Sequence, residues 1–157
     1  MEREEVLKEL KKPVEYTFEG NEKEFEEHIV LNIDMICEGL GLSQPEEVIQ
    51  QKQIRFEGSQ IIMDIIVMHK DKTVTMFEVK KINSKHPHTA TNAQMNSVGQ
   101  MLLYKNVLEA YTGVPVRVAL IAEKIFPRTM IIFNKNRLPL TLIEFQKDKI
   151  FVPYKNM

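Results

Sequence analysis

The sequence places Asp64 in one apolar run and Glu78 and Lys80 in the next, on either side of a polar stretch at 69–73. Two runs rich in Ile, Val and Phe that flank a turn signal are typical of a β-hairpin. A hairpin centred on Asp71 puts Asp64 opposite Glu78, and strand alternation puts Lys80 on the same face as Glu78. Facing carboxylates repel each other and charges within apolar strands need partners, so the pattern predicts a divalent cation between them.

These residue types suit one kind of chemistry. Carboxylate oxygens are hard ligands that Mg²⁺ and Mn²⁺ prefer, and Mg²⁺ keeps several of its waters when it binds one or two carboxylates. A cation on Asp64 and Glu78, with the backbone carbonyl of Val79 as a further ligand, would polarise a phosphate and lower the pKa of an attacking water. Lys80 would position that water and offset negative charge on the phosphate.

The elements that must position these residues follow from the apolar periodicity and from the Pro, Gly and Asn signals. We expect a connection from Pro45 onwards and a polar loop at Asn83–Asn92. The order of elements predicts an α/β fold, with one central mixed sheet flanked by helices. We expect strands at 53–57, 60–68, 73–80, 116–122, 140–145 and 149–152, and helices at 2–12, from Asn21 to Gly39 or Gly41, at 93–111 and at 127–137.

Composition indicates the class of protein. The chain has 157 residues, of which 43% are hydrophobic and 27% charged, which is typical of a globular protein. We interpret residues 1–157 as one domain. The absence of a long apolar stretch and of a signal-peptide pattern predicts a protein outside the membrane, and the single cysteine, Cys37, favours a reducing cytoplasm. The net charge of −1 argues against binding nucleic acid with the whole surface.

The spacing of the charged residues also matches a known family signature. Asp64, thirteen intervening residues and then Glu78-Val79-Lys80 resemble the signature of the PD-(D/E)XK nuclease superfamily, which has the restriction-endonuclease-like fold. Met63 stands where the signature has proline. The resemblance covers residues 21–120, and it implies a metal-dependent nuclease in which Asp64, Glu78 and Lys80 are catalytic.

Two further residues resemble an element of RecB-like members of this superfamily. Gln100 and Tyr104 form a Gln-x-x-x-Tyr pattern in the helix that follows the Glu-x-Lys strand. The residues are four apart, so they share one face of a helix. The resemblance implies that Gln100 helps to organise the metal site and that Tyr104 contacts nucleic acid. The simpler interpretation is a glutamine at a helix edge and a tyrosine packed on the sheet.

Members of the superfamily also carry a glutamate on an early helix that faces the metal. We choose Glu26 as a catalytic residue and metal ligand, because it borders the apolar stripe that includes Phe25 and Ile29. Glu22 is the second choice and Glu27 the third. The alternative is that these acidic residues only favour the positive end of the helix dipole.

Basic residues follow the Glu-x-Lys strand closely. The candidates for binding substrate phosphates are Lys81, Lys85, His86 and His88, and the alternative is a solvated loop.

The leading hypothesis is a Mg²⁺- or Mn²⁺-dependent nuclease that cleaves DNA, with RNA as an alternative substrate. A homodimer or a larger nucleic-acid-processing complex would supply a second active site or specificity. The alternative from another class is a catalytically silent module of the same fold that binds nucleic acid or protein.

Overall fold

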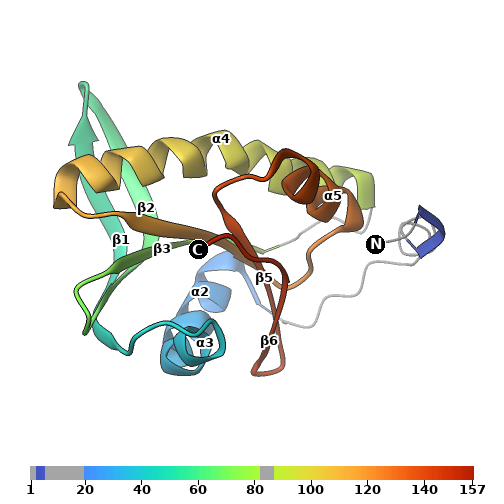
Figure 1. The fold of residues 1–157 in the computed structure, drawn as a ribbon, viewed down its shortest axis with the longest axis horizontal. Helices are drawn as coiled ribbons and strands as arrows, with labels where there is room; N and C mark the ends of the chain where they lie inside the picture. The colour runs from blue at the N-terminus through green and yellow to red at the C-terminus, as the bar shows by residue number, and fades with distance from the viewer. Residues whose placement is uncertain (1–2, 6–19, 82–86) are drawn as a thin grey trace.

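A computed structural model describes residues 3–5, 20–81 and 87–157, without the side chains of residues 87–90. These residues form one six-stranded sheet with helices on both faces (Figure 1). The elements are α2 (Glu22–Leu31), α3 (Ile33–Gly39), β1 (Pro45–Phe56), β2 (Ser59–His69), β3 (Val74–Lys80), α4 (Pro87–Thr112), β4 (Val116–Ala122), α5 (Pro127–Asn136), β5 (Thr141–Gln146) and β6 (Lys149–Tyr154).

The strands lie in the sheet in their order along the chain. The pairs β3–β4 and β4–β5 are parallel and the other neighbours are antiparallel, so the predicted mixed sheet is confirmed, and β1, β2 and β3 form an antiparallel meander. The two parallel connections contain α4 and α5. Successive right-handed crossovers that proceed in one direction place their helices on the same face of a sheet. Figure 1 shows α4 and α5 together on one face, with α2 and α3 on the other.

Each face of the sheet has its own apolar core. Met101 and Leu108 of α4 and Phe133 of α5 pack on one face, in a cluster that we call the α4 core. The side chains of α2 and α3 pack on the other face, in a cluster that we call the α2 core. The stripe predicted on the early helix is buried throughout, which confirms it: Phe25, Ile29, Ile33, Ile36 and Leu40.

The predicted start of the early helix is confirmed. Asn21 caps α2 by accepting a hydrogen bond from the backbone N–H of Glu24 at 2.8 Å, and the Glu24 side chain completes a capping box. The single predicted helix is divided at Asn32, whose side chain donates to the carbonyl of His28 at 2.9 Å. This local bond gives the backbone an alternative to continuing the helix.

Two boundaries differ from the prediction, and a third lies mostly outside the described residues. The segment after Pro45 was expected to be a connection, but it is the first half of β1 and pairs with β2. The expected loop at 83–92 is wrong from residue 87 onward, because α4 begins at Pro87. Proline is favoured at the first position of a helix, and a polar first turn needs no apolar stripe. Of the helix expected at 2–12, residues 3–5 are helical and the remainder lies outside the described residues.

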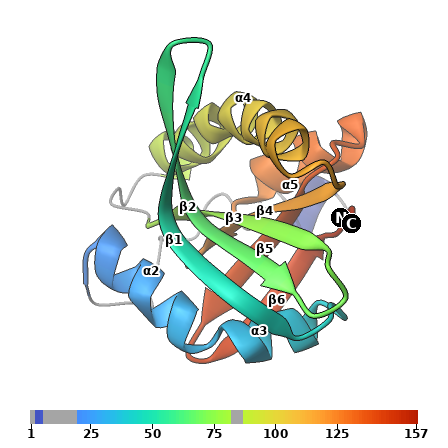
Figure 2. The same ribbon diagram turned by 90° about the vertical axis from the view of Figure 1, so that its left-hand side faces the viewer.

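The β1–β2 hairpin extends well beyond the rest of the sheet, as Figure 2 shows. Its two-residue turn is Glu57–Gly58, and both residues have positive φ, of 50° and 78°. Such turns match the twist of the strands, and glycine adopts this conformation at little cost. Within the described part of the chain, no helix is both long enough and apolar enough to cross a membrane.

Candidate active site

The hairpin of β2 and β3 brings Asp64 beside the end of β3. Four antiparallel pairs, from Ile65↔Phe77 to Met68↔Val74, confirm the register predicted for a hairpin centred on Asp71. Beyond the last pair, the two strands are joined by a side chain, because Asp64 Oδ2 accepts a hydrogen bond from the backbone N–H of Val79 at 2.8 Å. Asp64 is therefore held by the residue that separates Glu78 from Lys80.

Glu78 is a buried carboxyl that lacks its full set of partners. It is 5% exposed, and its Oε2 has no hydrogen-bond partner among the described residues. Burial, followed by the negative charge of Asp64, raises the pKa of Glu78 from 4.5 to about 8. The ammonium group of Lys80 lies 3.7 Å from Glu78 Oε1 and works against this shift. The site thus holds a carboxyl that needs a positive charge to be stable in its ionised form.

Helix α2 adds Glu26 to the same region. Glu26 is buried, and its two oxygens accept hydrogen bonds from the side chains of Gln50 at 3.0 Å and Gln51 at 2.7 Å. Burial raises the pKa of Glu26, and the charge of Asp64 adds to the effect. Of the three candidate glutamates on α2, Glu26 is the one whose side chain is buried toward the site.

The two alternatives to Glu26 are exposed. Glu22 lies close enough to Glu78 to contribute to its raised pKa, and it accepts the backbone N–H of Lys81 at 3.1 Å. Glu27 shows no such relation to the site. That Glu26 acts as a direct metal ligand stays a prediction, because both its oxygens already accept amide hydrogens.

Both strands of the β1–β2 hairpin are irregular at the position of Asp64. Gln51 has a φ of 52°, in the left-handed region, which costs a residue other than glycine roughly 1–2 kcal/mol. In β2, Met63 and Ile66 both belong to the α4 core, although they are three residues apart and would face opposite sides of a regular strand. Side chains of a regular strand alternate between faces, so the alternation changes phase here. The phase change falls at the position of Asp64, and strand irregularities of this kind re-aim side chains near active sites.

The residues of the predicted Gln-x-x-x-Tyr element differ in their surroundings. Tyr104 is 8% exposed and part of the α4 core, whereas Gln100 is exposed to solvent. Burial raises the pKa of Tyr104, and the charges of Glu78 and Asp64 raise it further, so the phenol lies within electrostatic reach of the site. The roles predicted for Gln100 and Tyr104 stay predictions.

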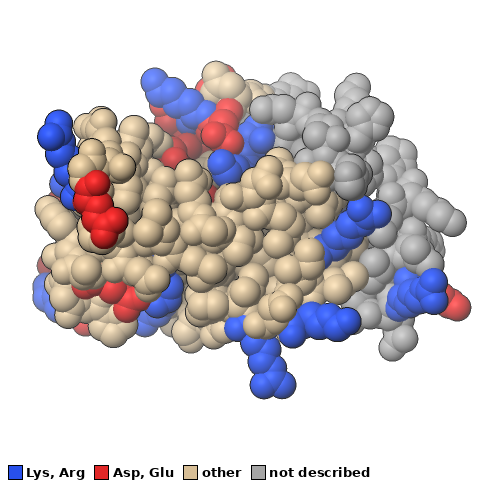
Figure 3. Space-filling model, turned by 90° about the horizontal axis from the view of Figure 1, so that it is seen from above, with Lys and Arg blue, Asp and Glu red and all other residues tan. Residues whose placement is uncertain are grey.

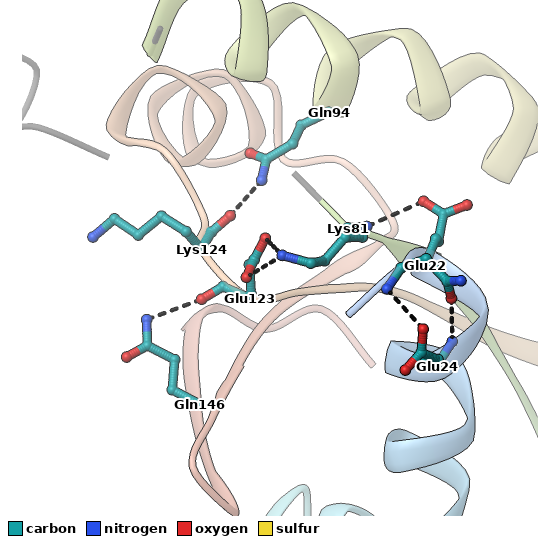
Figure 4. Close-up of polar contacts among 8 residues, drawn as sticks. Glu22, Glu24, Lys81, Gln94, Glu123, Lys124 and Gln146 are labelled. Carbon is teal, nitrogen blue, oxygen red and sulfur yellow. Dashed lines mark hydrogen bonds and ion pairs between the residues drawn. The ribbon is translucent and has the colours of Figure 1, made fainter. Parts of the chain in front are cut away.

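The predicted basic cluster is divided by the fold. The Lys81 ammonium binds both oxygens of Glu123, at 2.8 and 2.9 Å, and the two side chains are 7% and 0% exposed (Figure 4). As placed, Lys81 serves this ion pair, and contact with a phosphate stays a prediction. Lys85 and His86 lie outside the described residues, and His88 is described by its backbone alone.

The oxygen atoms at the site fit a hard divalent cation. Asp64, Glu78 and the carbonyl of Val79 are oxygen donors, and an ion that keeps several waters needs few protein ligands. The Oε2 of Glu78 is buried without a partner among the described residues, so it is free to accept a ligand. The described residues contain no set of three or more His, Cys, Asp or Glu side chains already at coordination spacing. A cation would therefore complete its sphere with water or substrate oxygens.

Sequence reasoning missed three side chains near the site. Gln50 and Gln51 had no motif to mark them, and only the register of β1 against β2 brings them to Glu26. Glu123 did have a signal, because it directly follows the apolar run of β4. The parallel pair Lys80↔Ala122 then makes Lys81 and Glu123 neighbours at the carboxyl ends of the two strands.

Comparison with solved structures shows the fold. The structure is similar to the crystal structure of a repair endonuclease from Pyrococcus abyssi, with a TM-score of 0.52, 22% sequence identity and 82% of this chain covered. The chain shares the fold of this endonuclease. It spans about half of that protein, since the match covers 48% of the endonuclease. No family model and no curated protein matches the sequence.

Two weaker likenesses were also found. An EndoMS–dsDNA complex matches with a TM-score of 0.46 and 19% identity, over 83% of this chain and 47% of the other. An XisH family protein from Nostoc punctiforme matches with a TM-score of 0.46 and 17% identity, over 67% of this chain and 84% of the other.

Proposed function

We propose that this protein is a Mg²⁺- or Mn²⁺-dependent nuclease that hydrolyses phosphodiester bonds in DNA, and that it belongs to the PD-(D/E)XK superfamily. One observation carries the proposal. Glu78 is buried with an unpartnered oxygen, Asp64 lies beside it, and the ammonium group of Lys80 lies 3.7 Å from its other oxygen. A carboxylate with a purely structural role is expected to have partners on both oxygens, whereas a metal ligand keeps an oxygen available for the cation. The fold shared with a repair endonuclease supports the same conclusion.

Each residue has a role that follows from its position. Asp64 and Glu78 hold the cation, which when bound supplies a Lewis acid and lowers the pKa of a water. Asp64 keeps its orientation through the N–H of Val79, and the carbonyl of Val79 is a further ligand. Lys80 orients the attacking water and offsets the charge that develops on the phosphate. Glu26, held by the two glutamines, adds negative charge at the α2 side of the site.

We propose that DNA approaches the carboxyl end of β3, where Lys80 lies. The face covered by α4 and α5 is largely uncharged, with charged side chains of both signs at its margins (Figure 3). Between Thr91 and Thr112, α4 carries two charged residues, Lys105 and Glu109, which pair with each other. Phosphate contacts dominate the affinity of proteins for DNA. Our candidates for contacts with the substrate are Tyr104, Lys81, Lys85, His86 and His88.

The test is a cleavage assay with matched controls. Wild type, Asp64→Asn and Lys80→Ala are incubated with circular, linear and single-stranded DNA and with RNA, in Mg²⁺, in Mn²⁺ and in EDTA. The controls Asp34→Asn and Lys135→Ala remove the same charges from exposed positions of α3 and α5. We expect the site variants to lose roughly 10²–10⁴-fold in rate, and the controls to keep the wild-type rate. EDTA should abolish cleavage.

The other outcomes separate the remaining hypotheses. Cleavage retained by folded Lys80→Ala or Asp64→Asn, with contaminating nuclease excluded, would contradict the proposal. Cleavage of RNA alone would keep the chemistry and change the substrate. Absence of both cleavage and Mn²⁺ binding in the wild type would favour a silent binding module. A homodimer that cuts both strands stays a prediction, which sedimentation of the protein with and without DNA tests.

A further inference from the structure

The side-chain amide of Gln51 lies between two carboxylates of the candidate metal site. Its Nε2 is 2.7 Å from Glu26 Oε1 and 3.3 Å from Asp64 Oδ1. A glutamine amide has two N–H donors, so one nitrogen satisfies both acceptors. Asp64 Oδ2 is fixed separately by the N–H of Val79. Both oxygens of Asp64 are therefore held, one from β3 and the other from Gln51 of β1.

The backbone of β1 is distorted at this residue. Gln51 has a φ of 52°, a conformation that a residue other than glycine rarely adopts inside a strand. Ile49 and Ile54 both pack against the α4 core, although they are five residues apart and would face opposite sides of a regular strand. The alternation of side chains in β1 therefore changes phase around Gln51. The distortion coincides with the phase change at Asp64 in the paired strand. Strained residues that the surrounding structure holds in place are concentrated at functional sites.

The neighbouring glutamine provides a contrast within the same strand. Gln50 also donates to Glu26, at 3.0 Å, but the structure gives it no contact with Asp64. The two residues thus share their effect on Glu26 and differ in their effect on Asp64. Glu78, whose Oε2 is buried and unpartnered, directly precedes Val79, the residue whose N–H binds the other oxygen of Asp64. Partners that orient a metal ligand from behind commonly determine how well the metal binds.

From these contacts we infer that Gln51 is a positioning residue for the divalent cation, which links Glu26 to Asp64 and holds the Asp64 carboxylate in its ligating orientation. The inference rests on the proposed metal site. It assigns Glu26 a role that acts through Gln51, in place of direct ligation. It also explains why β1 maintains a left-handed residue, since a regular strand would turn the Gln51 side chain to a different position.

The test measures Mn²⁺ binding by calorimetry, with MnCl₂ as the only added ligand, and thermal stability with and without Mn²⁺. Gln51→Met removes the amide and keeps the length of the side chain. We expect it to weaken Mn²⁺ binding by about 10–100-fold. Gln50→Met is the matched control, because it removes an amide from Glu26 and none from Asp64. It should lower the melting temperature without Mn²⁺ and weaken Mn²⁺ binding less than Gln51→Met does, since the partners of Asp64 are intact.

A second variant keeps the inference testable if Gln51→Met fails to fold. Gln51→Asn retains an amide and tolerates a positive φ better, but it is one methylene too short to reach both carboxylates. Relief of the backbone strain should offset part of the stability lost with these hydrogen bonds, so the variant should fold and still bind Mn²⁺ more weakly. Wild-type affinity in folded Gln51→Met or Gln51→Asn, together with loss of binding in Asp64→Asn, would overturn this inference alone. Absence of Mn²⁺ binding in the wild type would overturn the metal site and this inference together.

Discussion

Two buried glutamates at the ends of neighbouring parallel strands are in opposite states. Glu78 at the end of β3 is 5% exposed, and Glu123 after β4 is 0% exposed. Both oxygens of Glu123 are bound by Lys81, whereas Oε2 of Glu78 has no partner among the described residues. Lys80, the lysine nearest to Glu78, is 3.7 Å away and 30% exposed. The fold thus satisfies one buried carboxylate completely and leaves the other incomplete.

The difference separates a structural role from a functional one. The Lys81–Glu123 pair joins the ends of β3 and β4, and the backbone of the following turn is fixed as well. Gln146 donates to the carbonyl of Glu123 at 2.9 Å, and Ile125 donates to Glu144 at 2.9 Å. A chain that supplies so many partners at one strand end could have supplied one for Glu78. A buried polar atom without a partner needs an explanation, and the cation that we propose would provide one.

The largest effect on stability should come from breaking the satisfied pair. Glu123→Ala leaves the Lys81 ammonium buried without its carboxylate. Removing one member of a buried ion pair destabilises a protein by about 3–5 kcal/mol. Urea unfolding followed by circular dichroism measures the loss.

A double variant tests whether the pair is only structural. Lys81→Met with Glu123→Leu replaces both charges by apolar groups of similar size, which is often neutral or stabilising. We expect the double variant to recover most of the stability lost in Glu123→Ala and to cleave DNA with Mg²⁺. If the recovered protein folds normally but fails to cleave, Lys81 has a role in catalysis beyond this ion pair.

Removing the charge of Glu78, the carboxyl without a full set of partners, should stabilise the protein rather than destabilise it. Glu78→Gln resembles the protonated form of Glu78, which the folded protein favours because the pKa is raised from 4.5 to about 8. The folded state binds more protons than the unfolded state in this window, so metal-free wild type loses stability as pH rises from about 4.5 through 8. Glu78→Gln lacks this loss. Its stability relative to wild type should grow by on the order of 3 kcal/mol between pH 5 and pH 8.5.

Denaturant unfolding of both proteins in EDTA across this pH range measures the difference. Because other ionisable groups are common to both proteins, the difference isolates Glu78. Added Mn²⁺ should stabilise wild type at pH 8 and leave Glu78→Gln almost unchanged, since ionised ligands bind cations best. A pH-independent difference between the two proteins would show that Glu78 is ionised in the fold, and the contrast with Glu123 would then be lost.

The same contrast shows what the sequence could predict. The β2–β3 register followed from two apolar runs placed symmetrically about Asp71, because side-chain alternation and turn position determine a hairpin. The buried face of α2 and α3 followed from the helical spacing of Phe25 and its partners. Asp64, Glu78 and Lys80 were recognisable because charges interrupt apolar strands there. These features are local, or depend on one short turn.

The features that were missed depend on contacts between distant segments. The first half of β1, which contains Gln50 and Gln51, lacks an apolar alternation and is a strand because β2 pairs with it. The left-handed backbone at Gln51 has no signal such as Gly or Asn. Lys81 was expected to face a phosphate, and only the alignment of β3 with β4 reveals Glu123 as its partner.

The smallest expected effect tests whether the negative charges of Asp64 and Glu78 act on Tyr104 of α4. Burial raises the pKa of Tyr104, and Glu78 and Asp64 raise it further. Asp64→Asn removes one negative charge, so the pKa of Tyr104 should fall toward its ordinary value of 10 while staying above it, because burial remains. NMR titration of tyrosine labelled with ¹³C at Cζ measures this shift, with Tyr104→Phe to assign the resonance. Mn²⁺ is paramagnetic, so Mg²⁺ is the appropriate ion here, and it should lower the pKa in wild type more than in Asp64→Asn. An unchanged Tyr104 pKa in Asp64→Asn would separate the α4 tyrosine from the carboxylates and remove it from the candidates for substrate contact beside the metal.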